Sequence, residues 1–227
     1  MNQFIQSIIE SDENIILLHN DAYPYKHERV INLGLSEFLT IQYAHGLTLQ
    51  GYKVLIYSIS PYMLNKISYF SNDYNLHDIS FLSLQSMYVY HNDVYMARQN
   101  KMKVYAPYDK DQTRELITKN HDFKYIRMIV EDSIELTNNN TKINLRFPVL
   151  TYGWLYTYLS KIVQPILPII DLNTKIPYKG IVVEDHIRLS GLSDFVNTIY
   201  WIGIEHDTQI TKDQFVKYVL TQLRKLQ

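Results

Sequence analysis

Hydrophobic positions in the first 130 residues alternate between short continuous runs and helical spacing. Short apolar runs predict buried strands, whereas apolar positions three and four residues apart predict helices. The predicted strands are residues 15–19, 29–34, 52–58, 102–107 and 123–130. The predicted helices are residues 3–11, residues 36–50 and a segment that begins at Asp109. Strands that alternate with helices are typical of an α/β fold with a parallel sheet.

A polar, asparagine-rich stretch at residues 133–144 interrupts this pattern and predicts a linker. It divides the chain into a first domain, residues 1–132, and a smaller α/β domain, residues 145–227. The predicted strands of the second domain are residues 145–151, 166–172 and 180–185. Its predicted helices are residues 154–163, 190–199 and 211–226, the last with the capping-box spacing of Thr211 and Gln214.

The composition of the chain argues against several classes of function. The net charge of −1 and the dispersed basic residues argue against a nucleic-acid partner. The chain has no cysteine, which excludes disulfides and thiolate chemistry, and its histidines show no paired metal spacing. The N-terminus lacks the basic start of a signal peptide, and no apolar run reaches the ~20 residues of a membrane helix. We therefore expect a cytoplasmic protein without a metal site of its own.

Residues 28–51 carry the most informative motif. They read ERVINLGLSEFLTIQYAHGLTLQG, an arginine, an apolar strand and a small turn, then Glu37 and a helix with A-x-G spacing. This stretch resembles the pyrimidine-binding domain of transketolases, deoxyxylulose-phosphate synthases and the beta subunits of 2-oxo acid dehydrogenases. Residues 169–196 likewise resemble the C-terminal domain of that family. The resemblance covers nearly the whole chain in the family's order and implies two three-layer α/β/α domains.

The resemblance implies that Glu37 binds the aminopyrimidine of thiamine diphosphate at N1′. A carboxyl group that shares a proton with N1′ favours the imino tautomer, which removes the C2 proton of the thiazolium ring. Burial assists this step because a low dielectric raises the pKa of a carboxyl group. Without the surrounding motifs, Ser36 and Glu37 would be interpreted as an ordinary helix start.

Four further residues match positions that the family uses. Tyr62, with Ser60 before it, stands where relatives place an aromatic residue against the pyrimidine ring, which implies a cofactor contact. Asp21 ends the first strand at the carboxyl edge of the sheet, and Arg127 matches an arginine that contacts substrate in some relatives. The alternatives are a tyrosine of the core or surface, a local turn bond of Asp21 and a structural ion pair of Arg127.

The histidine loop of the family departs from its pattern here. Relatives carry G-x-T-H or G-x-S-H, whereas this chain has a shorter stretch without that glycine and threonine. His91 is the candidate for the catalytic histidine, and the alternative is an ordinary loop histidine. Lys66 stands where relatives have arginine, and we expect His186 to be structural.

The diphosphate-binding motif G-D-G followed by a distant asparagine is absent from the sequence. Mg²⁺ requires octahedral oxygen ligands and commonly bridges phosphates. The resemblance therefore implies a partner chain, the N-terminal section of a split transketolase, that holds Mg²⁺ and the diphosphate. The expected assembly is a heterotetramer with two chains of each kind.

Three functions follow from the resemblance. The first is a transketolase-like subunit that transfers a two-carbon ketol unit between sugar phosphates or related carbonyl compounds. The second is a non-catalytic homologue that serves as a binding or assembly partner, which the shortened histidine loop favours. The third is a beta subunit of the 2-oxo acid dehydrogenase type.

Overall fold

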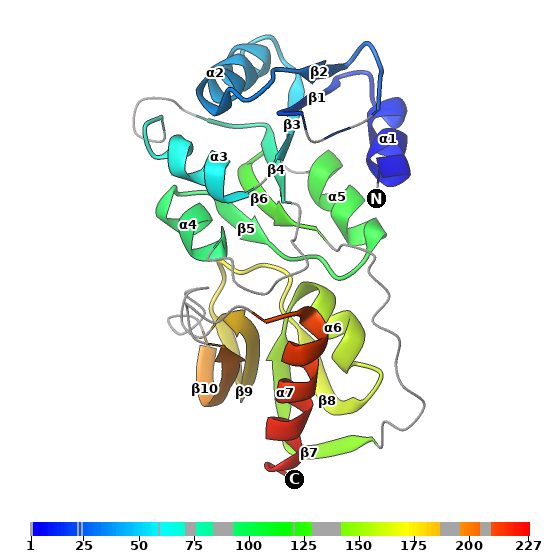
Figure 1. Cartoon of the computed structure of the whole chain (residues 1–227), viewed down its shortest axis with the longest axis vertical. Coiled ribbons are helices and arrows are strands. Elements are labelled where there is room, and N and C mark those ends of the chain that lie inside the picture. The colour runs from blue at the N-terminus through cyan, green and yellow to red at the C-terminus, as the bar shows by residue number, and fades with distance from the viewer. Residues whose placement is uncertain are drawn as a thin grey trace.

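The computed structural model describes residues 2–21, 23, 25–58, 60–70, 76–83, 93–119, 121–128, 142–186, 196–204 and 210–227. They form two α/β units, one above the other in Figure 1, each built on a parallel sheet. This confirms the fold class expected from the alternating pattern. No helix in the described part of the chain is long and apolar enough to cross a membrane.

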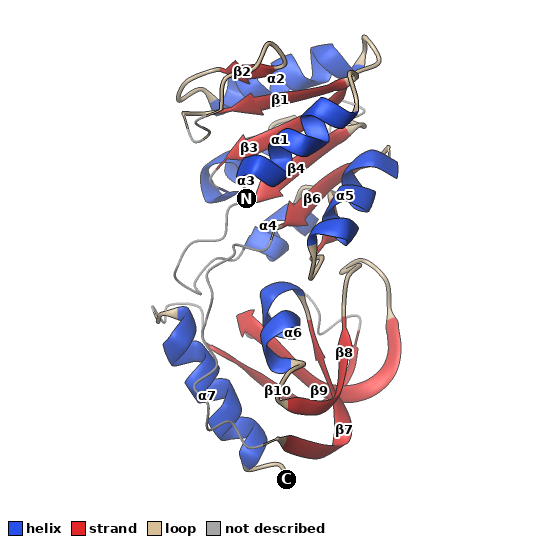
Figure 2. Cartoon of the chain, turned by 90° about the vertical axis from the view of Figure 1, so that its right-hand side faces the viewer, coloured by secondary structure: helices blue, strands red, loops and turns tan. Residues whose placement is uncertain are grey.

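The first unit has a six-stranded sheet in the order β2-β1-β3-β4-β6-β5. Its strands are β1 (Ile15–His19), β2 (Val30–Asn32), β3 (Lys53–Ser58), β4 (Ile79–Ser83), β5 (Lys103–Tyr105) and β6 (Phe123–Arg127). Its helices are α1 (Asn2–Ser11), α2 (Glu37–Thr48), α3 (Ser60–Ile67), α4 (Asp93–Gln99) and α5 (Lys110–Lys119). Helices α2, α3 and α4 lie on one face, and α1 and α5 lie on the other (Figures 1 and 2).

Side-chain alternation along the strands explains how both faces of this sheet are buried. In β1, Leu18 packs in the cluster beneath α2 and α3, whereas Leu17 packs in the cluster beneath α1 and α5. Val54 and Leu55 of β3 divide between the same two clusters. A parallel strand that is covered on both faces becomes a continuous apolar run, which is what the sequence shows at β1 and β3.

The second unit has a four-stranded sheet in the order β10-β9-β7-β8. Its elements are β7 (Ile143–Thr151), α6 (Gly153–Leu159), β8 (Val163–Pro168), β9 (Ile176–His186), β10 (Val196–Ile204) and α7 (Lys212–Arg224). Trp154 of α6 and Phe215 of α7 pack in one cluster with Val149 of β7. The predicted capping box of α7 is confirmed, since Gln214 N donates to Thr211 Oγ1 at 3.3 Å and Thr211 N donates to Gln214 Oε1 at 2.8 Å.

A short segment of the second unit covers the edge strand β5 of the first. Ala106 N donates to Ile170 O at 2.8 Å, and Leu172 N donates to Val104 O at 3.0 Å. The Asn173 side chain completes the pairing, with its Oδ1 3.0 Å from Val104 N and its Nδ2 3.1 Å from Val104 O. These bonds occupy strand groups that would otherwise face solvent. They join the two units through backbone groups.

Three expectations about secondary structure need correction or completion. The helix predicted at residues 190–199 is wrong over residues 196–199, which begin β10. The sequence pattern did not predict β4, α3 or α4. Residues 133–141 of the predicted linker lie outside the described part, and β7 already begins at Ile143. By contrast, Asp109 caps α5 as predicted, because Gln112 N donates to its Oδ1 at 2.8 Å.

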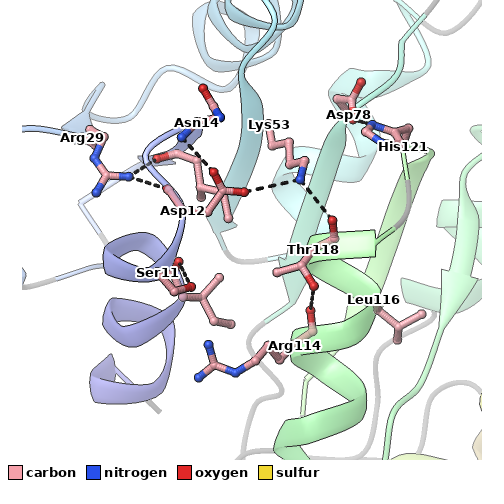
Figure 3. A network of polar contacts seen from close by, with 12 residues as sticks. Ser11, Asp12, Asn14, Arg29, Lys53, Asp78, Arg114, Leu116, Thr118 and His121 are labelled. Atoms are coloured by element: carbon pink, nitrogen blue, oxygen red, sulfur yellow. Dashed lines mark hydrogen bonds and ion pairs between the residues drawn. The ribbon is translucent and has the colours of Figure 1, made fainter.

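A polar network ties the amino ends of the strands together (Figure 3). Lys53 Nζ lies 3.4 Å from Asp12 Oδ2 and donates to Thr118 O at 3.0 Å. Arg29 Nη1 donates to Asp12 O at 2.6 Å, which holds the turn between α1 and β1. Nearby, buried Lys124 donates to Leu116 O at 2.6 Å. This network lies at the end of the sheet opposite to the strands' carboxyl ends.

We predict that Gly180→Ala destabilises the fold. A Cβ atom at residue 180 would lie 2.6 Å from Pro148 O and 3.0 Å from Leu150 Cγ. Because the closest atom is backbone, β7 and β9 would have to separate, and overpacking of this kind costs about 1–3 kcal/mol. Urea denaturation measures the free energy of unfolding. The control is Gly46→Ala, where nothing lies within 4 Å; equal stability of Gly180→Ala and wild type would contradict the prediction.

We also predict a pH-dependent contribution from Lys124. Burial lowers the pKa of its amine to about 8. The unfolded chain, in which a lysine has a pKa of about 10.4, then binds more protons above pH ~8, so stability rises with pH there. Relative to Lys124→Met, the wild-type free energy of unfolding should rise between about pH 8 and 9.5 and be level below pH ~7. A difference that is constant throughout this range would refute the prediction.

Candidate functional site

The candidate site lies at the carboxyl ends of the first sheet, where the chain changes direction across it. Strand β1 pairs with β2 on one side and β3 on the other. The loops that follow β1 and β3 therefore leave in opposite directions, and open α/β sheets bind ligands at such a point. Glu37 lies beside this point because it is the first residue of α2, directly after the β2 loop.

The loop that positions Glu37 is held by two asparagines. Asn20 Nδ2 donates to Gly34 O at 2.5 Å and to Thr40 Oγ1 at 3.0 Å, which ties the end of β1 to both sides of the turn. Asn32 Oδ1 accepts from Gly34 N at 2.9 Å. Gly34 has a φ of 62°, a conformation that glycine adopts without steric cost. The start of α2 is thus fixed by side-chain bonds to the backbone.

The carboxyl group of Glu37 makes no hydrogen bond or ion pair with any residue that the structure describes. Its side chain is partly buried in this single chain. At the amino end of a helix the backbone dipole favours a negative charge. A partly buried carboxylate without a partner among the described residues is available to bond to a ligand.

Asp21 is bonded to Asn32, the last residue of β2. It has a φ of 55°, and its Oδ1 accepts from Asn32 Nδ2 at 2.6 Å. Its side chain is exposed, so the loop after β1 presents the carboxylate at the carboxyl edge of the sheet.

Tyr62 and Ser60 both belong to α3, which follows β3. The Tyr62 side chain is 64% exposed. The Ser60 side chain and all of His91 lie outside the described residues, as does the His186 side chain. The structure thus places α3 directly after the carboxyl end of β3 and leaves the Tyr62 ring available to a second molecule.

Arg127 forms a buried ion pair. It ends β6, is 4% exposed, and its Nε lies 3.1 Å from Asp93 Oδ2. Tyr125 donates a hydrogen bond of 2.5 Å to the same carboxylate oxygen. The guanidinium also lies over the ring of Tyr152, 5.5 Å from its centroid, so this cluster connects β6, α4 and the second unit. These contacts are those of a structural ion pair, the alternative interpretation of Arg127.

Two residues of the site were not singled out from the sequence. His19 ends β1 and Asn20 follows it. Both are buried, yet His19 Nδ1 and Asn20 Oδ1 have no hydrogen-bond partner among the described residues. Burial lowers the pKa of His19, and the nearby Asp21 carboxylate offsets part of this shift. The available signal was their place at the end of a buried strand, just before Asp21. Polar atoms without partners at the end of a strand are typical of a functional region.

Comparison with known proteins bears on the fold. No protein-family model matches the chain, and no curated protein sequence matches it. Among solved structures, one described as "Split gene transketolase, inactive beta4 tetramer" matches with a TM-score of 0.61 over 99% of this chain and 95% of that chain. The chain has a transketolase-like fold. The sequence identity is 13%, so the likeness establishes the fold alone.

We predict that Arg127→Met destabilises the protein by about 3–5 kcal/mol, because it leaves the Asp93 carboxylate buried without its cation. The double variant Arg127→Met/Asp93→Asn should recover part of that loss, since neither buried charge remains. Urea denaturation of both single variants and the double variant measures the coupling. A loss below about 1 kcal/mol, as for exposed pairs, would show that the ion pair is not structural.

Proposed function

We propose that this chain is the C-terminal subunit of a split, thiamine diphosphate-dependent transketolase-like enzyme. The observation that carries the proposal is Glu37, a carboxylate without a described partner at the start of α2, beside the direction change of a sheet with the transketolase-like fold. The solved neighbour is itself described as a split gene transketolase. The proposed reaction is transfer of a two-carbon ketol unit between sugar phosphates or related carbonyl compounds.

The residues present fit the pyrimidine end of the cofactor. Glu37 offers a carboxyl group that is free to share a proton with a ring nitrogen, and Tyr62 offers an exposed ring for stacking. Ser60 is the further cofactor contact that we propose, and Asp21 is the proposed contact to substrate. When bound, thiamine diphosphate would supply the carbanion chemistry, while the protein supplies binding and orientation. The buried contacts of Arg127 favour a positioning role for it over direct contact with substrate.

The partner in this proposal is an N-terminal section that carries G-D-G and the distant asparagine. That chain would hold Mg²⁺ and the diphosphate, because this sequence has no such motif. Two chains of each kind would form the closed assembly. The partly exposed start of α2 fits a site that is completed only when a second polypeptide covers it.

Non-catalytic binding or assembly is the second candidate. It is favoured by the solved neighbour, which is described as an inactive tetramer of beta chains, so a protein of this fold can assemble without activity. The two candidate functions differ in whether the assembled chains bind cofactor and convert substrate.

The test of the proposal is Glu37→Gln in the assembly with the partner chain. The variant keeps the size of the side chain and removes the carboxyl group that shares the proton. We expect thiamine diphosphate to bind in the presence of Mg²⁺, while turnover falls by roughly 10²–10⁴-fold, the usual contribution of an acid–base group. Titration calorimetry measures binding, and a coupled ketol-transfer assay measures turnover.

The matched control is Glu115→Gln. Glu115 pairs with Lys119 on the surface of α5, on the other face of the sheet, so its loss should leave turnover unchanged. If Glu37→Gln is as active as wild type, the role of Glu37 is wrong. If the wild-type assembly binds no cofactor, the non-catalytic candidate replaces the enzyme.

A further inference from the structure

The second unit contains a cavity of about 300 Å³, a volume at the lower end of the range for small-molecule sites. The cavity forms around the loop that joins β8 to β9, which Figure 2 shows as an arch at the end of the unit that faces the first unit. Most of its lining is apolar, with side chains from Leu150, Leu167, Ile169, Ile170, Ile176 and Pro177. The candidate site around Glu37 uses none of these residues.

The inner wall of the cavity is fixed by the core and by the backbone. Leu150 and Ile169 are at most 4% exposed and pack in the large cluster that both units share. Ile170 O accepts a hydrogen bond of 2.8 Å from Ala106 N of the first unit. Leu167, by contrast, is 37% exposed at the cavity. The cavity is therefore formed before any ligand arrives and is reached from the side of Leu167.

The walls select an aliphatic body. A water molecule needs two to four polar neighbours, whereas apolar cavities bind small apolar molecules. No aromatic ring lines the cavity among the described residues, so it offers nothing on which a sugar or a base could stack. A volume of about 300 Å³ holds roughly ten groups of the size of a water molecule, at ~30 Å³ each. A short hydrocarbon chain fits this space.

The charged groups of the lining select the other end of the ligand. Asp171 already accepts three hydrogen bonds, from Asn173 N at 2.8 Å, Asn173 Nδ2 at 2.6 Å and Thr174 Oγ1 at 2.8 Å. Lys175 is exposed and makes no hydrogen bond or ion pair with any residue that the structure describes. Its ammonium group is a point charge with three donors. The charge that this cavity offers to a ligand is thus positive.

We propose that this cavity binds a short-chain aliphatic carboxylate, with the chain against Leu150 and Leu167 and the carboxylate beside Lys175. Because Ile170 and Asn173 of the same loop pair with β5, a bound acid would also stabilise the junction between the two units. The site lies entirely within this chain and needs neither thiamine diphosphate nor a partner chain.

Isothermal titration calorimetry of the purified full chain at pH 7 tests this binding. We expect hexanoate to bind with a Kd of roughly 0.1–1 mM, as is usual for a ligand of so few atoms. Each CH₂ group added between butanoate and hexanoate should tighten binding about two- to fourfold. That gain should end by about decanoate, whose chain exceeds the cavity. Hexylamine, which carries the opposite charge, should bind at least fivefold more weakly than hexanoate.

Two variants test the place and the charge of the site. Leu167→Glu puts a negative charge on the wall and should abolish binding of hexanoate, whereas Tyr200→Glu makes the same change of charge on β10 and should not. Lys175→Met should weaken hexanoate about two- to fivefold, the range for an exposed ion pair, and leave hexan-1-ol unchanged. Lys161→Met, at an exposed lysine outside the cavity, is its control. Circular dichroism checks that the variants are folded.

Native-state hydrogen exchange tests the link to the junction. The amides of Ala106 and Leu172 are the donors of the bonds that join the loop to β5. At a hexanoate concentration ten times its Kd, their exchange should slow about tenfold, because opening of the loop releases the ligand. Hexylamine at the same concentration is the control and should have a smaller effect.

The outcomes decide the proposal in either direction. Absence of binding heat with hexanoate up to ~20 mM would overturn it. So would equal affinity for hexylamine, unchanged binding in Leu167→Glu, or exchange of Ala106 and Leu172 that hexanoate leaves unaffected. Binding that tightens from butanoate to hexanoate and is lost in Leu167→Glu, but not in Tyr200→Glu, would support it. None of these measurements involves Glu37 or its cofactor, so this proposal can fail while the proposed function stands.

Discussion

The parallel pairing of β1 with β2 on one side and β3 on the other is the constraint on which the site depends. It forces the chain to leave the sheet in two directions from neighbouring strands, and it places Asn20, Asp21 and Glu37 at the same edge. Because β1 is buried on both faces, a shift of one residue in its register would exchange the side chains of two hydrophobic clusters. The core thereby fixes the position of the polar groups that follow the strand.

Helix α2 contributes both to the core and to the candidate site. Its inner face packs on the sheet, and its first residue carries the carboxylate of the candidate site. Phe38, at the margin of the outer face, contacts Tyr69 and Phe70 after α3, each with ring centroids 5.4 Å apart. An assembly that buries this face would hold the amino end of the helix more rigidly.

The sequence predicts the fold correctly where apolar side chains bury a strand on both faces. Continuous apolar runs at β1 and β3, the glycine after α2 and the cap of α5 each have a local cause that a pattern can detect. Strand β4 was not predicted because Ser80 and Ser83 interrupt its run of apolar residues, although both serines are buried in the sheet. The helix predicted at residues 190–199 is wrong over residues 196–199, where β10 begins, because β-branched and aromatic residues suit the pleated surface beside β9. Position 37 was found through its motif, whereas the contacts of Arg127 with Asp93 and Tyr152 depend on tertiary packing that spacing does not encode.

The side-chain amide of Asn173 imitates a peptide group. It offers one donor and one acceptor to Val104, as the backbone of another strand would, yet it has no continuing chain on its far side. Growth of the sheet by addition of a foreign strand therefore ends at this residue. Together with the backbone of residues 170 and 172, this amide covers the margin of the first sheet at which fibrous polymerisation could otherwise begin.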